Sequence, residues 1–132
     1  MNNSELLNKA KTAMEKSYSP YSEIKVGAAL LCSDGSVYLG CNIENAAFSP
    51  TCCAERVAFF KAISDGKRNF SAVAVYSDHP DAEKHGFPPC GVCRQVMSEF
   101  CGSDFKIVLQ SGGGAVSYTL DSLLPQSFGL NW

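Results

Sequence analysis

Three cysteines and one glutamate, in two short segments, carry the chemistry that this sequence indicates most clearly. Cys53 precedes Glu55 by two residues, and Cys90 and Cys93 form a Cys-x-x-Cys pair that follows a proline. This pair has the spacing of a zinc knuckle, in which thiolates bind the metal. A structural zinc site is normally closed by four protein ligands, whereas a catalytic site keeps one position open for water. The two segments offer three soft ligands and an acid beside the metal.

Glu55 favours the catalytic interpretation. Cys-x-Glu followed by Pro-Cys-x-x-Cys is the signature of zinc nucleobase deaminases, in which a glutamate that does not bind the metal acts as general acid and base. Most glutamates are exposed helix residues, but one placed two residues from a metal cysteine can reach a zinc-bound water. Cys52 competes with Cys53 for the metal, and the Cys-x-Glu spacing selects Cys53. His79 and His85 are fourth-ligand candidates in principle, although lone loop histidines are usually solvated.

Arg56 follows Glu55 directly and has two interpretations. Zinc with three thiolates keeps one net negative charge, which makes the centre a poorer acidifier of water. A positive group that donates hydrogen bonds to the sulfurs would offset this charge. A solvated helix arginine explains the same position equally well.

Composition limits the class of protein. The chain has 132 residues, of which 45% are hydrophobic and 18% charged, so we expect one folded domain over residues 1–132. The net charge of −2 and the scattered basic residues argue against a nucleic-acid surface. No apolar stretch is long enough for a bilayer, so no membrane partner is expected. Seven cysteines without a recognisable secretion signal favour metal binding or free thiols and a reducing cytoplasm.

Strands and helices alternate along the chain, which predicts an α/β fold with helices packed over a mixed sheet. Cys53 and Cys90 both fall at predicted helix starts, where free N–H groups and the helix dipole favour thiolate. Asp34-Gly35 predicts a tight hairpin between the first two strands. The predicted helices are 4–16, 52–64, 90–101 and 121–124, the predicted strands are 26–31, 37–41, 71–76, 105–110 and 115–119, and the predicted polar loops include 42–50 and 78–89.

Several further motifs are similar to those of the small, homotetrameric type of zinc-dependent cytidine deaminase. These motifs are spread over nearly the whole chain and follow one another in the same order as in that family. The metal motif is shared by many deaminases, whereas Asn-Ile-Glu-Asn-Ala and the C-terminal Leu-Leu-Pro…Phe are more particular to enzymes of free nucleosides. The matching stretches are Pro-Tyr-Ser at 20–22, Val-Gly-Ala-Ala-Leu at 26–30, Asn-Ile-Glu-Asn-Ala at 42–46, Cys-Ala-Glu-Arg at 53–56, Pro-Cys-Gly-Val-Cys-Arg-Gln at 89–95, and Leu-Leu-Pro at 123–125 with Phe128.

The resemblance implies a cytidine deaminase-like three-layer α-β-α fold with a mixed five-stranded sheet. It also implies hydrolytic deamination of cytidine and deoxycytidine to uridine and deoxyuridine, a reaction of pyrimidine salvage. Cys53, Cys90 and Cys93 would hold one Zn²⁺ per subunit of a homotetramer. A zinc-bound hydroxide would attack C4, with Glu55 as the proton shuttle.

The resemblance further assigns residues to the substrate. Asn42 and Glu44 would hydrogen-bond the ribose hydroxyls, although unaided this stretch is simply a polar loop. The backbone of Ala54 would contact the pyrimidine. Phe128 would stack on the base, in the family usually from a neighbouring subunit; it could equally close the core. Ile24 stands where the family commonly has a base-contacting Phe, and aromatic stacking from that position is lost.

A second departure from the family is Phe48, which stands where a tyrosine often occurs, so any hydrogen bond from that hydroxyl is missing. Three other functions remain open. A non-catalytic zinc module would close the site with a fourth cysteine. A polynucleotide deaminase would need to grip a nucleic-acid backbone, which the acidic balance disfavours. A deaminase of a cytosine-containing antibiotic would share the zinc motif but would not be expected to keep the Asn42 and Glu44 sugar contacts.

Overall fold

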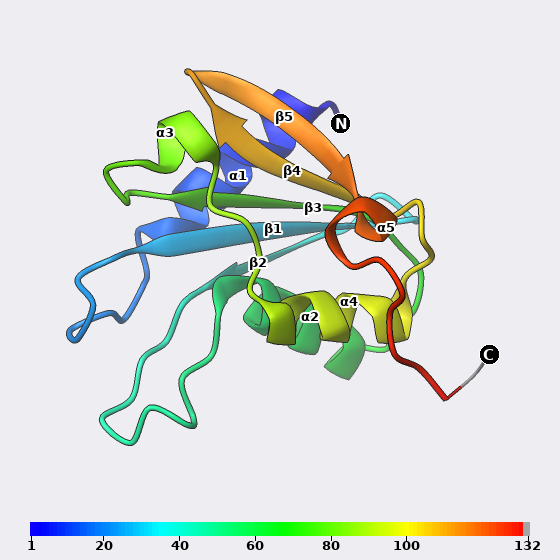
Figure 1. The fold of residues 1–132 in the computed structure, drawn as a ribbon, viewed down its shortest axis with the longest axis horizontal. Coiled ribbons are helices and arrows are strands. Elements are labelled where there is room, and N and C mark those ends of the chain that lie inside the picture. The colour runs from blue at the N-terminus through cyan, green and yellow to red at the C-terminus, as the bar shows by residue number, and fades with distance from the viewer. Residues whose placement is uncertain (131–132) are drawn as a thin grey trace.

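A five-stranded mixed sheet forms the centre of the computed structural model, which describes residues 1–130 (Figure 1). The strands are β1 (Val26–Cys32), β2 (Val37–Cys41), β3 (Phe70–Ser77), β4 (Lys106–Ser111) and β5 (Gly114–Thr119). Their order is β2-β1-β3-β4-β5, and only the β3–β4 pair is parallel. The helices are α1 (Asn3–Met14), α2 (Ala54–Ser64), α3 (Ala82–His85), α4 (Gly91–Phe100) and α5 (Leu120–Leu123). None of them is long and apolar enough, within the described residues, to cross a membrane.

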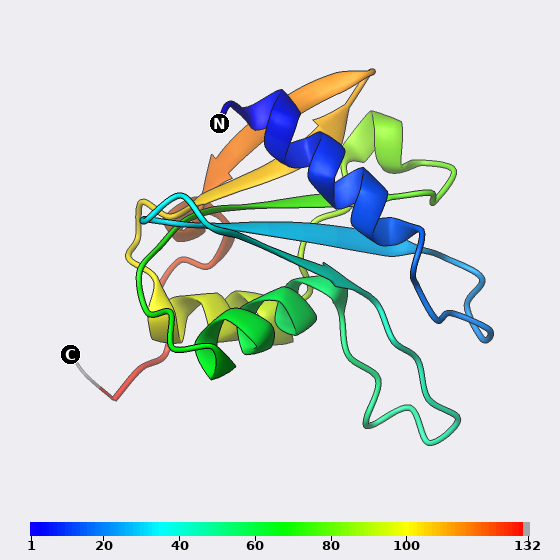
Figure 2. The ribbon, with the colours of Figure 1, turned by 180° about the vertical axis from the view of Figure 1, so that it is seen from behind.

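Helices cover both faces of the sheet. The helix α1 lies across one face, and Figure 2 shows it from that side. The helices α2 and α4 lie on the opposite face. Side chains alternate along each strand, so Ala29 packs against α1 while Ala28 and Leu30 pack into the larger cluster with α2 and α4. The predicted three-layer α-β-α fold is confirmed.

Two glycines allow these helices to approach the strands closely. A Cβ on Gly40 in β2 would lie 2.3 Å from the carbonyl oxygen of Ala54 and 2.6 Å from the nitrogen of Ala58. A Cβ on Gly27 in β1 would lie 2.0 Å from the carbonyl oxygen of Ala10. Because real Cβ atoms do not come so near backbone atoms, each strand needs glycine at its contact. Gly40 thereby allows the first turn of α2 to lie directly against β2.

Most predicted elements are present with small differences at their ends. The first helix is capped by Asn2, whose side chain accepts a hydrogen bond from the Glu5 amide at 2.8 Å, and it begins at Asn3, one residue before the predicted start at residue 4. The predicted loop 78–89 was partly wrong, because it contains α3. Glu83 in this helix accepts hydrogen bonds from Gly112 and Gly113 in the β4–β5 turn, and these distant contacts stabilise the short helix.

Candidate active site

The starts of α2 and α4 bring the three candidate metal ligands together. Cys53 is the N-cap residue of α2 and Cys90 that of α4, and neither side chain caps its own helix. The Sγ atom of Cys90 lies 3.7 Å from that of Cys53 and 3.5 Å from that of Cys93. All three sulfurs lie within 4.8 Å of one another. The predicted placement of both segments at helix N-termini is confirmed.

The spacing of these sulfurs fits a tetrahedral zinc ion. Zn–S bonds of about 2.3 Å at tetrahedral angles place sulfurs about 3.8 Å apart, close to the observed 3.5 and 3.7 Å. Within residues 1–130, no fourth His, Cys, Asp or Glu joins the group. Cys52 lies outside it, as do His79 and His85. A donor set of three thiolates leaves a tetrahedral ion one position for a non-protein ligand.

Electrostatic interactions favour the thiolate form of Cys53. The pKa of Cys53 is lowered to about 5, first by a hydrogen bond with Cys93 and then by those with Arg56 and Cys90, against the opposing effect of burial. The pKa of Cys93 is raised, because its interaction with Cys53 and its burial both favour the thiol form. The Arg56 Nη2 atom lies 3.4 Å from the Cys53 sulfur. Arg56 therefore stands where a positive charge would offset the thiolates.

Glu55 lies in the first turn of α2 and is only 3% exposed. Burial raises the pKa of its carboxyl group to about 7. A carboxyl group with such a pKa can both accept and donate a proton near neutrality. Glu55 lines the same cavity as Cys53 and Cys90, so the acid and the metal ligands face a common space.

This cavity has a volume of about 340 Å³, a suitable size for a small ligand. Four of the five residues predicted to contact a substrate line it, namely Ile24, Asn42, Glu44 and Ala54. Phe128, the fifth, is not among the lining residues; the residue is 64% exposed, and its carbonyl accepts a hydrogen bond from Gln95 at 3.0 Å. Within a single chain, the C-terminal aromatic is therefore separate from the cavity.

Asn42 is almost fully buried, and its amide is largely occupied. Its Oδ1 atom accepts from the Val26 amide at 3.0 Å and from the Ser17 hydroxyl, and its Nδ2 atom donates to the Ile24 carbonyl at 2.9 Å. An amide nitrogen carries two hydrogens, so one N–H is left for a ligand. The same bonds hold the chain before β1 against the end of β2.

Glu44 is also fixed by local hydrogen bonds. Its carboxylate accepts from the amides of Tyr21 and Ser22 at 2.9 and 3.1 Å and from the Ser22 hydroxyl. These donors, the Ser22 hydroxyl first, lower the pKa of Glu44 and keep it ionised. A carboxylate has about four acceptor positions, so one remains. Asn42 and Glu44 together present one donor and one acceptor, which is what neighbouring hydroxyl groups require.

Sequence reasoning missed part of the cavity wall. Phe87 and Pro88 line it, together with Val26, Thr51 and Cys52. Phe87 and Pro88 directly precede the Pro-Cys-x-x-Cys segment, so their nearness to the metal cysteines was an available signal. Ser17, which supports Asn42 across 25 residues, gave no such signal.

A three-cysteine metal site at two helix starts, with a buried glutamate beside it on a mixed sheet, defines the class of zinc-dependent deaminases. The sequence model of the cytidine and deoxycytidylate deaminase zinc-binding region matches residues 1–109. The chain belongs to this family.

Relatives of the chain agree in sequence and in structure. It is 49% identical over 124 residues to the cytidine deaminases of Sporosarcina psychrophila and Halalkalibacterium halodurans, covering 93% of this chain in both cases and 88% and 91% of those proteins. The crystal structure of cytidine deaminase from Burkholderia pseudomallei superposes with a TM-score of 0.88 at 44% identity, covering 97% of this chain and 100% of that one. The resemblance noted in the sequence is thus confirmed.

Proposed function

We propose that this protein hydrolyses the exocyclic amine of cytidine and deoxycytidine, forming uridine or deoxyuridine and ammonia. The observation that carries the proposal is the group of Cys53, Cys90 and Cys93 beside a nucleoside-sized cavity that Cys53, Cys90 and Glu55 line. The three cysteines would hold one zinc ion. When bound, zinc acidifies water so that it can attack an electrophilic carbon at neutral pH.

Glu55 is the proton carrier in this proposal. It would accept a proton from the attacking water and give it to N3 of the ring. It would then accept the proton of the hydroxyl group newly added at C4 and deliver it to the departing amine. Its burial and raised pKa support this role, because the carboxyl group must change protonation state more than once in each turnover. Arg56 would stabilise the thiolate of Cys53 through its Nη2 atom.

The opposite end of the cavity would receive the sugar. The remaining N–H of Asn42 and the remaining acceptor of Glu44 would bind the ribose hydroxyls, and the backbone of Ala54 and the side chain of Ile24 would contact the base. Two hydroxyl-binding groups favour a free nucleoside over a cytosine antibiotic. The net charge of −2 likewise favours a nucleoside over a polynucleotide, because a nucleic-acid backbone would call for a basic surface.

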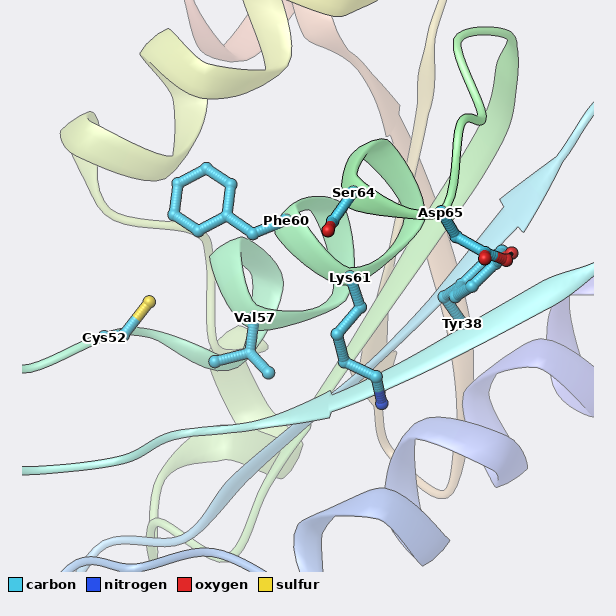
Figure 3. A pocket seen from close by; sticks show the side chains of 7 residues that line it. All are labelled: Tyr38, Cys52, Val57, Phe60, Lys61, Ser64 and Asp65. Carbon is cyan, nitrogen blue, oxygen red and sulfur yellow. Dashed lines mark hydrogen bonds between the residues drawn. The ribbon is translucent and has the colours of Figure 1, made fainter.

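We also propose that the protein works as a homotetramer. Phe128 is exposed in the single chain and would complete the base site of a neighbouring subunit. A second hollow along α2 supports subunit contact, because apolar side chains line it beside the polar Lys61, Ser64 and Asp65 (Figure 3). Phe60 and Val57 project there from α2, and Phe60 is 47% exposed. Light scattering after size-exclusion chromatography should give four times the chain mass of 14.2 kDa.

A reducing compartment suits the chemistry of the site. All seven cysteines are free thiols in the structure, and three of them form the candidate metal site. Oxidation of these thiols would remove the ligands, so we place the working protein in the cytoplasm.

The substrate assignment is tested by comparing cytidine, deoxycytidine, free cytosine and a cytosine antibiotic in one ultraviolet assay. The proposal requires turnover of both nucleosides with much higher kcat/KM than for the other two compounds. The Glu55→Ala variant should fold and bind zinc, but its turnover rate should fall by at least about 10²- to 10⁴-fold. Turnover near that of the wild type in this variant would refute the proton-carrier role. Preference for free cytosine or the antibiotic would refute the nucleoside assignment.

A further inference from the structure

One part of the cavity wall has no role in the proposed mechanism. The proposed function assigns the lining residues Cys53, Cys90 and Glu55 to the reacting end and the lining residues Asn42 and Glu44 to the sugar end. A pyrimidine held between these ends needs apolar side chains against its flat faces. Besides Ile24 and Ala54, which the proposed function already places against the base, the apolar lining side chains are Val26, Phe87 and Pro88.

Phe87 supplies the one aromatic ring among the described residues that line the cavity. We infer that its ring covers one face of the base and sets the affinity of the enzyme for its substrate. This inference rests on the proposed function, since it assumes that the ligand is a nucleoside. Aromatic rings stack favourably on nucleobases, whereas aliphatic side chains such as Ile24 give contact area only.

The ring of Phe87 is held in place by the hydrophobic core and by the ring of His79. It is half-buried and packs against the core cluster that also includes residues of α2 and α4. The ring of His79 lies against it with a centroid distance of 6.0 Å. His79 is fixed in turn, because its Nδ1 atom accepts from the Asp81 amide at 3.1 Å and its own amide donates to the buried Ser77 hydroxyl at 3.1 Å.

The backbone before Phe87 also contributes to its position. Gly86 has a φ of +72°, a conformation that favours glycine. A Cβ at this position would meet the Leu109 side chain at 3.1 Å. The chain therefore turns after α3 in a way that other residues adopt only with strain, and this turn brings Phe87 to the cavity. A ring that is positioned before the substrate arrives binds it at a lower entropic cost.

The primary test replaces the ring while keeping an apolar side chain. Phe87→Leu should raise the KM for cytidine about 10-fold, within the range for removing a base–aromatic stack, while kcat changes much less. Phe87→Tyr keeps the ring and should stay close to the wild type. Phe70→Leu is the matched control, because Phe70 is also half-buried against the same cluster but is not a lining residue. It should lower thermal stability without changing KM.

A double-mutant cycle tests the support from His79. His79→Ala should raise KM by less than Phe87→Leu and should add nothing in the Phe87→Leu background, because its effect passes through that ring. Additive effects would overturn the supporting role.

Calorimetric binding of uridine gives a readout that needs no turnover, and Phe87→Leu should weaken it by the same factor as KM. If the wild type deaminates cytidine but Phe87→Leu leaves both KM and uridine affinity unchanged, this inference is wrong and the proposed function stands. A wild type that neither binds uridine nor deaminates cytidine would overturn both.

Discussion

Replacing Gly40 with alanine should destabilise the protein and loosen the metal site together. The new Cβ would stand 2.3 Å from the Ala54 oxygen and 2.6 Å from the Ala58 nitrogen. Both are backbone atoms, so α2 must move away from β2 as a whole. Overpacking costs about 1–3 kcal/mol, and these two backbone contacts place Gly40→Ala near the upper end. For a chain of this length, about 3 kcal/mol lowers Tm by about 10 °C.

Thermal unfolding and zinc competition against a chelator measure the two effects. Because Cys53 and Ala54 begin the displaced helix, Gly40→Ala should also bind zinc more weakly than the wild type. Gly129→Ala is the control, since a Cβ there meets nothing within 4 Å, and it should leave both quantities unchanged. Gly27→Ala introduces a similar clash on the α1 face and should lower Tm with less effect on zinc. A neutral surface substitution changes Tm by no more than about 2 °C. A Gly40→Ala variant that melts within this range of the wild type would refute the close contact between β2 and α2.

Three further predictions concern the ligands, Arg56 and acid stability. Cys90→Ala should lose zinc and melt at a lower temperature, because metal binding contributes to folding; metal analysis showing full zinc content would contradict its role. Arg56→Gln should lower kcat or zinc affinity about 10- to 100-fold with little change in Tm, and unchanged values would make Arg56 only a surface residue. The pKa of Glu83 is lowered, chiefly by hydrogen bonds from the Gly113 amide and Gln110. The ionised Glu83 carboxylate therefore stabilises the fold fully above about pH 5, where the carboxyl group is also ionised in the unfolded chain. This stabilisation is lost as the pH falls through the lowered pKa that Glu83 has in the folded state. The Tm difference between the wild type and Glu83→Gln should accordingly be largest near neutral pH and vanish in strong acid; a difference that does not change with pH would exclude this linkage.

Local patterns in the sequence predicted the parts of the structure that depend on neighbouring residues. The first helix, the Asp34-Gly35 hairpin and the helix starts at Cys53 and Cys90 all follow from residues within one or two turns of each other. The metal site was predictable for the same reason, because each half of it is a short motif on one helix start. Only the meeting of the two halves required the fold.

Contacts between distant residues account for what the sequence did not reveal. The helix α3 depends on hydrogen bonds that the amides of Gly112 and Gly113, far along the chain, donate to Glu83. Gly40 resembles any strand glycine until α2 is placed against it. The limited hydrogen-bonding capacity of Asn42 follows from Ser17 and Val26, which only the folded chain brings to it.

The dependence of turnover on zinc is tested most directly by following cytidine absorbance with the wild-type protein in three states. These are the protein as purified, the protein after treatment with a zinc chelator, and the same protein after zinc is restored. Metal analysis of the same samples gives the zinc content of each chain. We expect one zinc per chain, turnover that disappears with the metal, and recovery when zinc returns. Turnover that persists in metal-free protein, or its absence in fully zinc-loaded protein, would contradict this expectation.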